Sequence, residues 1–450
     1  MLDISKLNRV HFLGIGGISI SSLALFLRTQ NIAVSGSDRI FSNKLLELSD
    51  NNCTIYVGEE FEALEKADLV VFSSAIPQNS PEMVYCKTKN IPTMERYIFL
   101  GHIAKLFQNV IAISGTHGKT TTTALMCHIF KNFLYKHYAH IGGEAIDISN
   151  FYYSGNDYFV TEACEYKKSL LSLYPNISII LNVENDHPDT YHNLQEIYTS
   201  FSQFIRQSQC TVINGDSPFY ESINQTNNNL ITFGKNPNNQ YTIENIKECT
   251  TGGLGYDILH YGCPLCHIRT SLFGCHNVYN ITSCVVVCTL LGMDINKVAE
   301  YVGTFKGVKR RFEEIGLCQG ARIISDYAHH PTEIKESIST ANKILKPGKK
   351  LYVVFQPHTY SRTLSLFAQF ITCFENCDCL IILKEYSARE DSSQGLSAHQ
   401  LYDNITHANK HYYDNTLDVS SFLLNNIMPD DIVLILGAGD VDNVAKILVI

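Results

Sequence analysis

The stretch GTHGKTTTT, residues 115–123, has the residue types and spacing of a phosphate-binding loop. An apolar run, residues 110–114, precedes it and a helical pattern follows, which is the context that such a loop requires. Lys119 is expected to contact the β- and γ-phosphates, and the Thr120 hydroxyl is a candidate Mg²⁺ ligand. Because position 113 is isoleucine, the loop is the shortened form G-T-x-G-K-T. The pattern predicts that a nucleoside triphosphate binds through Gly115, Thr116, His117, Gly118, Lys119, Thr120 and Thr121.

Polar residues that follow two further apolar runs are candidate metal ligands. Glu162 ends the run in DYFVTEACE, and Asp186 and His187 follow the run in ISIILNVENDHPDTY. In an open parallel sheet, the carboxyl ends of the strands meet at one edge and ligands bind there. Thr120, Glu162 and His187 are therefore predicted to converge on a metal ion. The alternative is that Glu162 and His187 are helix caps or structural polar residues.

A glycine turn near the N-terminus predicts a second nucleotide site. In RVHFLGIGGISISSLALFL, an apolar strand runs into glycines and then into a helical pattern. Asp38 ends the next apolar run about twenty residues on, where dinucleotide-binding folds place a ribose-binding acid. Position 19 is serine, so the third glycine of G-x-G-x-x-G is missing. The turn therefore predicts a nucleotide or nucleotide-sugar site rather than NAD specifically, and a purely structural turn stays open as an alternative.

The elements that position these residues alternate between strands and helices along the whole chain. The third segment repeats the pattern, with strand-like runs in ARIISD, LYVVF, CLIIL and DIVLIL. We expect an α/β protein of three domains: a Rossmann-like N-terminal domain (residues 1–106), a central P-loop ATPase-type domain (107–312) and a C-terminal Rossmann-like domain with a mainly parallel sheet (313–450).

Composition excludes several classes of function. The 450 residues are 45% hydrophobic and 18% charged, with a formal net charge of −9 and no Lys/Arg-rich run, so nucleic acid is not an expected partner. The sequence has no run of eighteen apolar residues, so no membrane span is predicted. The N-terminus lacks the pattern of a signal peptide. We therefore expect a cytoplasmic protein. The fifteen cysteines, including those of CPLCH (residues 263–267), are interpreted as reduced thiols, with half a zinc site as the less favoured alternative.

With these residues laid out, the chain resembles the Mur ligase family from end to end. HFLGIGG, SGSD and SSAIP resemble its first domain. GTHGKTTTT, TEACE, NVENDHPDTY, GCHNVYN and GVKRRFE resemble its central ATPase domain, and DYAHHPTEI, QPHTYSRT and GAGD resemble its third. The resemblance implies ATP-dependent joining of an amino acid, L-alanine, to the lactyl carboxylate of UDP-N-acetylmuramate, with ATP and Mg²⁺ required. An acyl phosphate is the implied intermediate, and ADP and phosphate are released.

The resemblance also implies roles for individual residues. Lys119, Glu162, His187, Arg311 and His329 are the expected catalytic residues. Five further residues are expected to contact ATP. His276, Asn277 and Asn280 resemble contacts on the adenine side. Arg311 would reach the phosphates, and Asp326 resembles a ribose or hinge contact. His329 and Arg362 would lie near the amino acid, whose carboxylate suits an arginine fork. The expected UDP-sugar residues are Gly16, Gly17, Ser37, Asp38, Ser73 and Ser74. A single Arg or His in such a loop can instead be solvated or capping.

The sequence departs from the family pattern at three places, and the third of them helps to decide which amino acid the ligase adds. Position 359 is Thr where many relatives read Arg, and TEACEYKKS replaces EADESDGS but keeps Glu162. Residues 188–206 contain no lysine, so the carbamylated lysine of some family members is not available here. This favours the alanine-adding branch over the glutamate- and diaminopimelate-adding ones.

Other functions explain less of the chain. A recycling ligase that adds a tripeptide to UDP-N-acetylmuramate is the nearest alternative, although its glycine turn typically lacks the GIGG form. An NAD-dependent oxidoreductase would account only for the first hundred residues. A non-catalytic nucleotide sensor would need no second substrate pocket.

Overall fold

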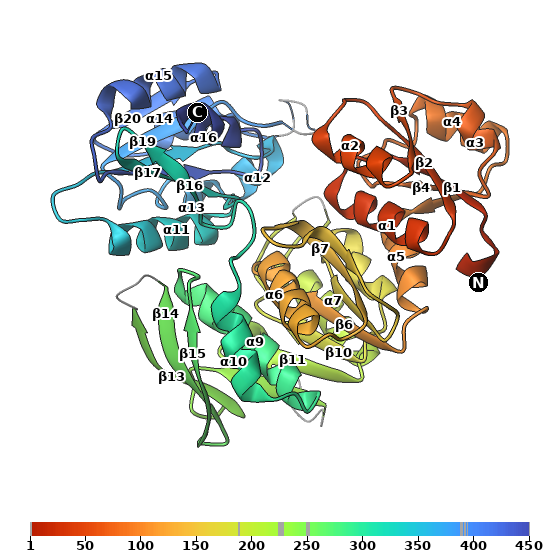
Figure 1. Cartoon of the computed structure of the whole chain (residues 1–450). Helices are drawn as coiled ribbons and strands as arrows, with labels where there is room; N and C mark the ends of the chain where they lie inside the picture. The colour runs from red at the N-terminus through yellow and green to blue at the C-terminus, as the bar shows by residue number, and fades with distance from the viewer. Residues whose placement is uncertain are drawn as a thin grey trace. The chain divides into compact units, whose positions relative to one another are not determined.

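The computed structural model describes residues 2–187, 190–223, 229–248, 253–387, 390, 393 and 395–449. Three β-sheets follow one another along the chain, and helices flank each of them (Figure 1). The chain divides into two compact units. The first unit comprises residues 1–184, 194–271 and 276–306, and the second comprises residues 185–193, 272–275 and 307–450. The expected α/β architecture with three sheet-containing parts is confirmed.

The first sheet has five parallel strands in the order β3-β2-β1-β4-β5. Its strands are β1 (Arg9–Leu13), β2 (Ala33–Asp38), β3 (Thr54–Val57), β4 (Leu69–Phe72) and β5 (Thr93–Glu95). The helices of this part are η1 (Ile4–Lys6), α1 (Ile18–Thr29), α2 (Asn43–Asp50), α3 (Glu62–Glu65), α4 (Pro81–Thr88) and α5 (Arg96–Ala104). The central strands β1 and β4 are buried along nearly their whole length because helices cover both faces of a parallel sheet.

The central sheet has ten strands in the order β15-β14-β13-β12-β11-β10-β6-β9-β7-β8. Its strands are β6 (Asn109–Ser114), β7 (His137–Ala145), β8 (Ser149–Tyr153), β9 (Tyr158–Glu162), β10 (Ile177–Ile180), β11 (Cys210–Asn214), β12 (Leu230–Gly234), β13 (Tyr241–Glu248), β14 (Leu254–His260) and β15 (Cys263–Thr270). The helices of this part are α6 (Lys119–Asn132), η2 (Tyr166–Ser172), α7 (Leu194–Gln207), α8 (Pro218–Ser222), α9 (Cys275–Leu290) and α10 (Ile295–Thr304). Because β6, β9 and β10 are parallel neighbours, their carboxyl ends share one edge of the sheet.

An antiparallel extension widens the central sheet at one end. β13 pairs with β14, and β14 pairs with β15. The CPLCH stretch forms the first half of β15, with Cys263 exposed and His267 bonded to Asp257 at 2.6 Å. Among the described residues, neither cysteine of CPLCH belongs to a cluster of three potential metal ligands. The stretch therefore lies in a strand, as expected, and the chemical state of these thiols stays a prediction.

The third sheet is parallel except at one edge. Its order is β16-β17-β21-β18-β19-β20, and only β16 is antiparallel to its neighbour. The strands are β16 (Glu313–Cys318), β17 (Ala321–Asp326), β18 (Leu351–Phe355), β19 (Cys379–Leu383), β20 (Lys410–Tyr413) and β21 (Ile432–Leu436). The helices are α11 (Pro331–Ile344), α12 (Tyr360–Ser365), α13 (Phe367–Phe370), α14 (Ala398–Asn404), α15 (Thr416–Asn426) and α16 (Asp442–Leu448).

Alternating side chains of this third sheet build two apolar cores. In β18, Leu351, Val353 and Phe355 pack with residues of α11 and α14. Tyr352 and Val354 point the other way and pack with residues of α15 and α16. Figure 1 shows α11 and α15 on opposite sides of the sheet. Burial on both faces explains why these strands appear in the sequence as unbroken apolar runs.

The helices in the part of the chain that the structure describes are short or carry polar faces. None of its helices is both long enough and apolar enough to cross a bilayer.

Candidate active site

The phosphate-type loop lies between β6 and α6, as the sequence predicts. Gly115 and Gly118 have φ of 139° and 87°, a region that favours glycine, and Gly118 is the residue before the first turn of α6. The loop is fixed by Asn182, which follows β10. The Asn182 side chain accepts a hydrogen bond from the backbone N–H of His117 at 2.8 Å and donates one to the His117 carbonyl at 3.1 Å. The backbone N–H groups at the start of α6 can face an anion.

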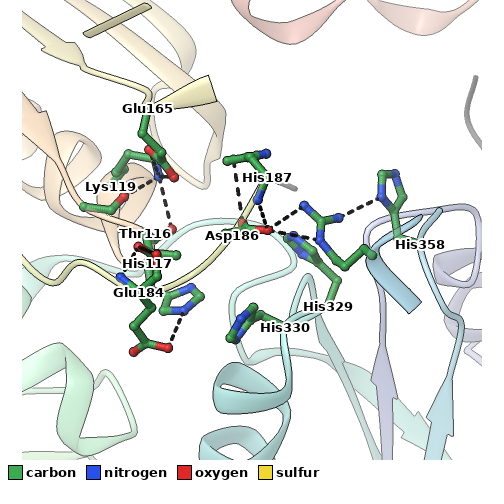
Figure 2. Close-up of polar contacts among 12 residues, drawn as sticks. Thr116, His117, Lys119, Glu165, Glu184, Asp186, His187, His329, His330 and His358 are labelled. Atoms are coloured by element: carbon green, nitrogen blue, oxygen red, sulfur yellow. Dashed lines mark hydrogen bonds and ion pairs between the residues drawn. The ribbon is translucent and has the colours of Figure 1, made fainter. Parts of the chain in front are cut away.

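Lys119 is held beside this loop by a buried carboxylate. Its ammonium donates to both oxygens of Glu165, at 2.9 and 3.1 Å, and to the carbonyl oxygens of Gly115 and Thr116 (Figure 2). The side chains of Lys119 and Glu165 are only 13% and 3% exposed. Burial alone would lower the pKa of Lys119, but the charge of Glu165 outweighs it and raises the pKa. The lysine is therefore positively charged at neutral pH.

Two predicted metal ligands lie near this loop in the first unit. Thr120 is buried in the first turn of α6, and Glu162 is the last residue of β9, whose neighbour β6 leads into the loop. A Glu162 oxygen accepts the backbone N–H of Gly142 at 2.6 Å, which fixes the carboxylate beside β7. A threonine hydroxyl and a carboxylate are oxygen donors of the kind that Mg²⁺ prefers. These two residues therefore fit a magnesium ion chemically.

His187, the third predicted metal ligand, belongs to the second unit. Its backbone N–H donates to Asp186 at 2.7 Å, and its imidazole lies 3.7 Å from the same carboxylate. Because Thr120 and Glu162 belong to the first unit, the convergence of all three residues on one ion stays a prediction.

The residues of GCHNVYN lie at the start of α9. Asn277 and Asn280 are buried and bonded to each other at 2.9 Å. The Asn280 side chain lies against Gly118, and a Cβ at Gly118 would collide with it. His276 is in the same first turn. Gly118 therefore must be glycine both for its φ and for its contact with Asn280, and the predicted nucleotide residues of α9 adjoin the phosphate-type loop.

The glycine turn of the first sheet is closed by Asp38. Its carboxylate accepts the backbone N–H of Gly16 at 2.9 Å. The Ser37 hydroxyl donates to Glu82 at 2.6 Å, and the Ser73 hydroxyl accepts the backbone N–H of Ala75 at 3.2 Å. Gly17 ends the turn at the start of α1, and Ser73 and Ser74 are the first two residues after β4. All six predicted UDP-sugar residues therefore lie at the carboxyl ends of β1, β2 and β4.

Ser19, which stands in place of the third glycine, has a structural role in the first unit. Its hydroxyl lies 2.8 Å from Nε2 of His140 on β7 and accepts a hydrogen bond from Arg96 at 2.7 Å. The serine that replaces the third glycine of G-x-G-x-x-G thus links α1 to the central sheet through hydrogen bonds.

In the second unit, Arg362 and Asp186 form a buried ion pair. Nε and Nη2 of Arg362 lie 3.3 and 3.2 Å from the same Asp186 oxygen, and Nη1 lies 3.2 Å from His358 (Figure 2). Burial would raise the pKa of Asp186, but His187 and Arg362 outweigh it and lower that pKa well below its usual range. The fork predicted to bind an amino-acid carboxylate therefore already holds an internal carboxylate.

His329, Arg311 and Asp326 lie around the start of α11. Burial, with Arg362 nearby, lowers the pKa of His329 to about 3, so the imidazole is neutral. Arg311 lies 3.7 Å from Glu333 and stacks over Tyr327 at 5.1 Å. Burial raises the pKa of Asp326 to about 6, although Ser337 donates to this carboxylate. The second unit thus contains five of the predicted residues: His187, Arg311, Asp326, His329 and Arg362.

Sequence reasoning did not find the carboxylate partners of the two main cations. Glu165 is the second acid of TEACE, and the pairing joins residues 46 positions apart. The sequence singles out Asp186 only by its place after a strand, and its partner Arg362 is 176 positions away. The presence of two acids in the short motif TEACE was the signal in the sequence that could have suggested a role for Glu165.

The chain is a P-loop α/β protein of three parts. Its second sheet carries a glycine-rich phosphate-type loop, and one further α/β sheet precedes it and one follows it along the chain. The model of the Mur ligase family catalytic domain matches residues 9–108, that of the Mur ligase middle domain matches residues 113–288, and that of the Mur ligase glutamate ligase domain matches residues 310–439. The chain belongs to the Mur ligase family.

Similar proteins match over nearly their full length. A UDP-N-acetylmuramate–L-alanine ligase of Clostridium botulinum is 37% identical, with 99% of this chain and 98% of the relative covered. One of Clostridium beijerinckii is 38% identical, with 97% and 96% covered. Among solved structures, the UDP-N-acetylmuramate–alanine ligase of Thermotoga maritima has a TM-score of 0.84 at 24% identity, covering 98% of each chain. A murein peptide ligase of Psychrobacter arcticus has a TM-score of 0.74 at 21% identity, also covering 98% of each. The two structures support the fold.

Proposed function

We propose that this protein is an ATP-dependent ligase that joins L-alanine to the lactyl carboxylate of UDP-N-acetylmuramate in peptidoglycan precursor synthesis. The observation that carries the proposal is the match, at 37–38% identity over 97–99% of the chain, to relatives named for this reaction. The loop around Lys119 supports the ATP dependence, since its glycines and its lysine have the geometry of a phosphate site.

The reaction balances in two steps. A carboxylate oxygen of the sugar attacks the γ-phosphorus of ATP, the bond to the β–γ bridging oxygen breaks, and ADP leaves. The amine of L-alanine then attacks the acyl carbon, loses a proton, and displaces inorganic phosphate. The first step brings an anion against a polyanion, so positive charge must be supplied where the transferring oxygens gather charge.

We propose that ATP is bound by the loop residues 115–121 together with His276, Asn277 and Asn280. Lys119 supplies positive charge to the β- and γ-phosphates, and Arg311 and Asp326 add contacts to the phosphates and the ribose. Thr120, Glu162 and His187 would hold Mg²⁺. That ion would neutralise phosphate charge when bound.

The other substrates are assigned to the flanking parts of the chain. Arg362 and His329 are proposed to face L-alanine, and the turn closed by Asp38 is proposed to hold the UDP group. The six proposed UDP-sugar residues, at the ends of β1, β2 and β4, are Gly16, Gly17, Ser37, Asp38, Ser73 and Ser74. We place the domain boundaries at residues 106/107 and 312/313, which the family matches 9–108, 113–288 and 310–439 support. We also propose a cytoplasmic location.

The test is phosphate release from ATP with Mg²⁺ and UDP-N-acetylmuramate, with one amine added at a time. Release that requires both the sugar and L-alanine is the expected result. Release that requires the tripeptide would move the protein to the recycling ligase, and NADH binding without any release would favour the oxidoreductase.

Lys119→Ala tests the loop in the same assay. We expect turnover to fall at least about a hundredfold, because the transferring phosphate loses a buried positive charge. The control is Lys66→Ala, which removes a lysine that is 56% exposed and paired with the surface residue Glu62. Equal turnover in wild type and Lys119→Ala would exclude the proposed role of the loop.

A further inference from the structure

The hydrogen bonds of Lys119 leave no donor for a phosphate. An ammonium group has three N–H donors. Here its acceptors are the carbonyl oxygens of Gly115 and Thr116 and the carboxylate of Glu165. A nucleoside triphosphate that binds through Lys119 must take the place of at least one of these acceptors.

Glu165 is the acceptor that a triphosphate would replace. Its carboxylate resembles a phosphate in charge and in having two oxygens on one centre, and both of its oxygens reach Lys119. Two anions around one buried cation repel each other, whereas a neutral carbonyl does not repel a phosphate. With Glu165 only 3% exposed, water screens that repulsion weakly.

The backbone around Glu165 is built to hold the carboxylate in this place. Lys167 and Lys168 follow it with φ of 51° and 57°, two consecutive non-glycine residues in the left-handed region. The backbone N–H of Lys168 donates to the Glu165 carbonyl at 2.8 Å, and the Lys167 ammonium lies 3.5 Å from Glu95. Such a conformation costs about 1–3 kcal/mol per residue and persists where surrounding contacts enforce it.

We propose that Glu165 is a positioning residue of the nucleotide site: its carboxylate holds the Lys119 ammonium beside the loop and competes with the phosphate oxygens of a nucleoside triphosphate for it. Glu162, three residues earlier, has a different partner, the backbone N–H of Gly142, so the two acids of TEACE have separate tasks. The inference rests on the proposed function only in requiring that the loop bind a triphosphate.

The test is calorimetric titration of the full chain with ATP in EDTA, without sugar or amino acid. In Glu165→Gln, we expect ATP to bind about tenfold more tightly, since an internal competitor with a charged hydrogen bond is removed. AMP lacks the β- and γ-phosphates, so its Kd should stay the same. Glu165→Asp keeps the charge but shortens the reach, and a smaller gain is expected. The thermal midpoint of each variant verifies folding.

Two controls separate competition from a general change in the chain. Glu47→Gln also removes one carboxylate from a buried lysine, Lys44, at 2.5 Å, but lies on α2, and its ATP Kd should not change. In a Lys119→Ala background, the effect of Glu165→Gln should disappear. Unchanged or weaker ATP binding in folded Glu165→Gln, or equal tightening without Lys119, would overturn the inference. Because no turnover is measured, failure of the ligase reaction would show separately in the phosphate-release assay.

Discussion

At the scale of single residues, the predicted anion-binding cations each lie beside an internal carboxylate. Lys119 lies 2.9 Å from Glu165, Arg362 lies 3.2 Å from Asp186, and Arg311 lies 3.7 Å from Glu333. Burying a charge without a partner is costly, so these carboxylates stabilise the cations where they are. An anionic substrate that binds one of these cations must therefore displace, or share the cation with, the carboxylate that is already paired with it.

The Arg362 pair gives a stability prediction at this scale. Asp186→Asn should lower the free energy of unfolding of the second unit by about 3 kcal/mol, because a neutral amide leaves a buried guanidinium without a counter-charge. Urea unfolding followed by hydrogen exchange in peptides of residues 307–450 would measure it. Glu314→Gln is the control: its partner Arg322 is 2.7 Å away, but Glu314 is 46% exposed, so a loss under about 1 kcal/mol is expected. Equal losses in both variants would contradict the argument.

At the scale of elements, the start of α12 is strained. Thr359 precedes this helix with φ of 66° and ψ of 146°, a conformation close to one that only glycine adopts readily. Its backbone N–H bonds to Tyr386, and its carbonyl accepts the Thr363 hydroxyl at 2.8 Å. These contacts hold the first turn of α12, and so they place Arg362.

Thr359→Gly should therefore raise the unfolding free energy of the second unit by about 1 kcal/mol, since the relief of strain exceeds the added entropy of a glycine in the unfolded chain. Thermal unfolding would measure the change. Asn90→Gly is the matched comparison, because Asn90 also has a positive φ, 56°, but asparagine tolerates that region. A lower midpoint for Thr359→Gly than for wild type would show that the side chain contributes more than its strain costs.

The sequence predicted elements well where a long apolar run ends in polar residues. β1, β2, β6, β9, β10 and β17 lie within a residue or two of the expected runs, and the loop follows β6 as expected. The short strands β3 and β5 and the antiparallel pairing of β13, β14 and β15 were not predicted. β3 and β5 are short and partly exposed, and the pairing of strands is a tertiary property that local spacing does not show. The pairings of Lys119 and Arg362 were missed because they depend on tertiary folding, not on local spacing.

At the scale of the whole molecule, buried histidines are distributed unequally between the two units. In the first unit, burial lowers the pKa of His11 and His137 to about 4 and of His140 to about 3. In the second unit, burial also lowers the pKa of His329 to about 3, but it raises that of Asp326 to about 6. A histidine with a lowered pKa stays neutral in the fold while the unfolded chain takes up a proton below pH 6.5, so stability falls on acidification.

The first unit should therefore be the more acid-sensitive one. Between pH 7 and pH 5, His11, His137 and His140 each cost about 2 kcal/mol. In the second unit, the raised pKa of Asp326 acts in the opposite direction and offsets about two-thirds of the loss at His329. Hydrogen exchange at both pH values, corrected for intrinsic rates, would compare peptides of the two units. His140→Gln should reduce the pH dependence of the first unit by about one proton. Equal sensitivity of both units would contradict the prediction.

The division of the chain into units has a consequence for cutting it into fragments. The second unit is not one continuous stretch, because residues 185–193 and 272–275 belong to it while their flanking strands and helices belong to the first. A fragment expressed from residue 307 onward would keep Arg362 and lose Asp186, so its interior would hold an arginine whose counter-ion was left on the discarded piece. The C-terminal part should therefore be studied within the intact chain, or supplied with a peptide that restores residues 185–193.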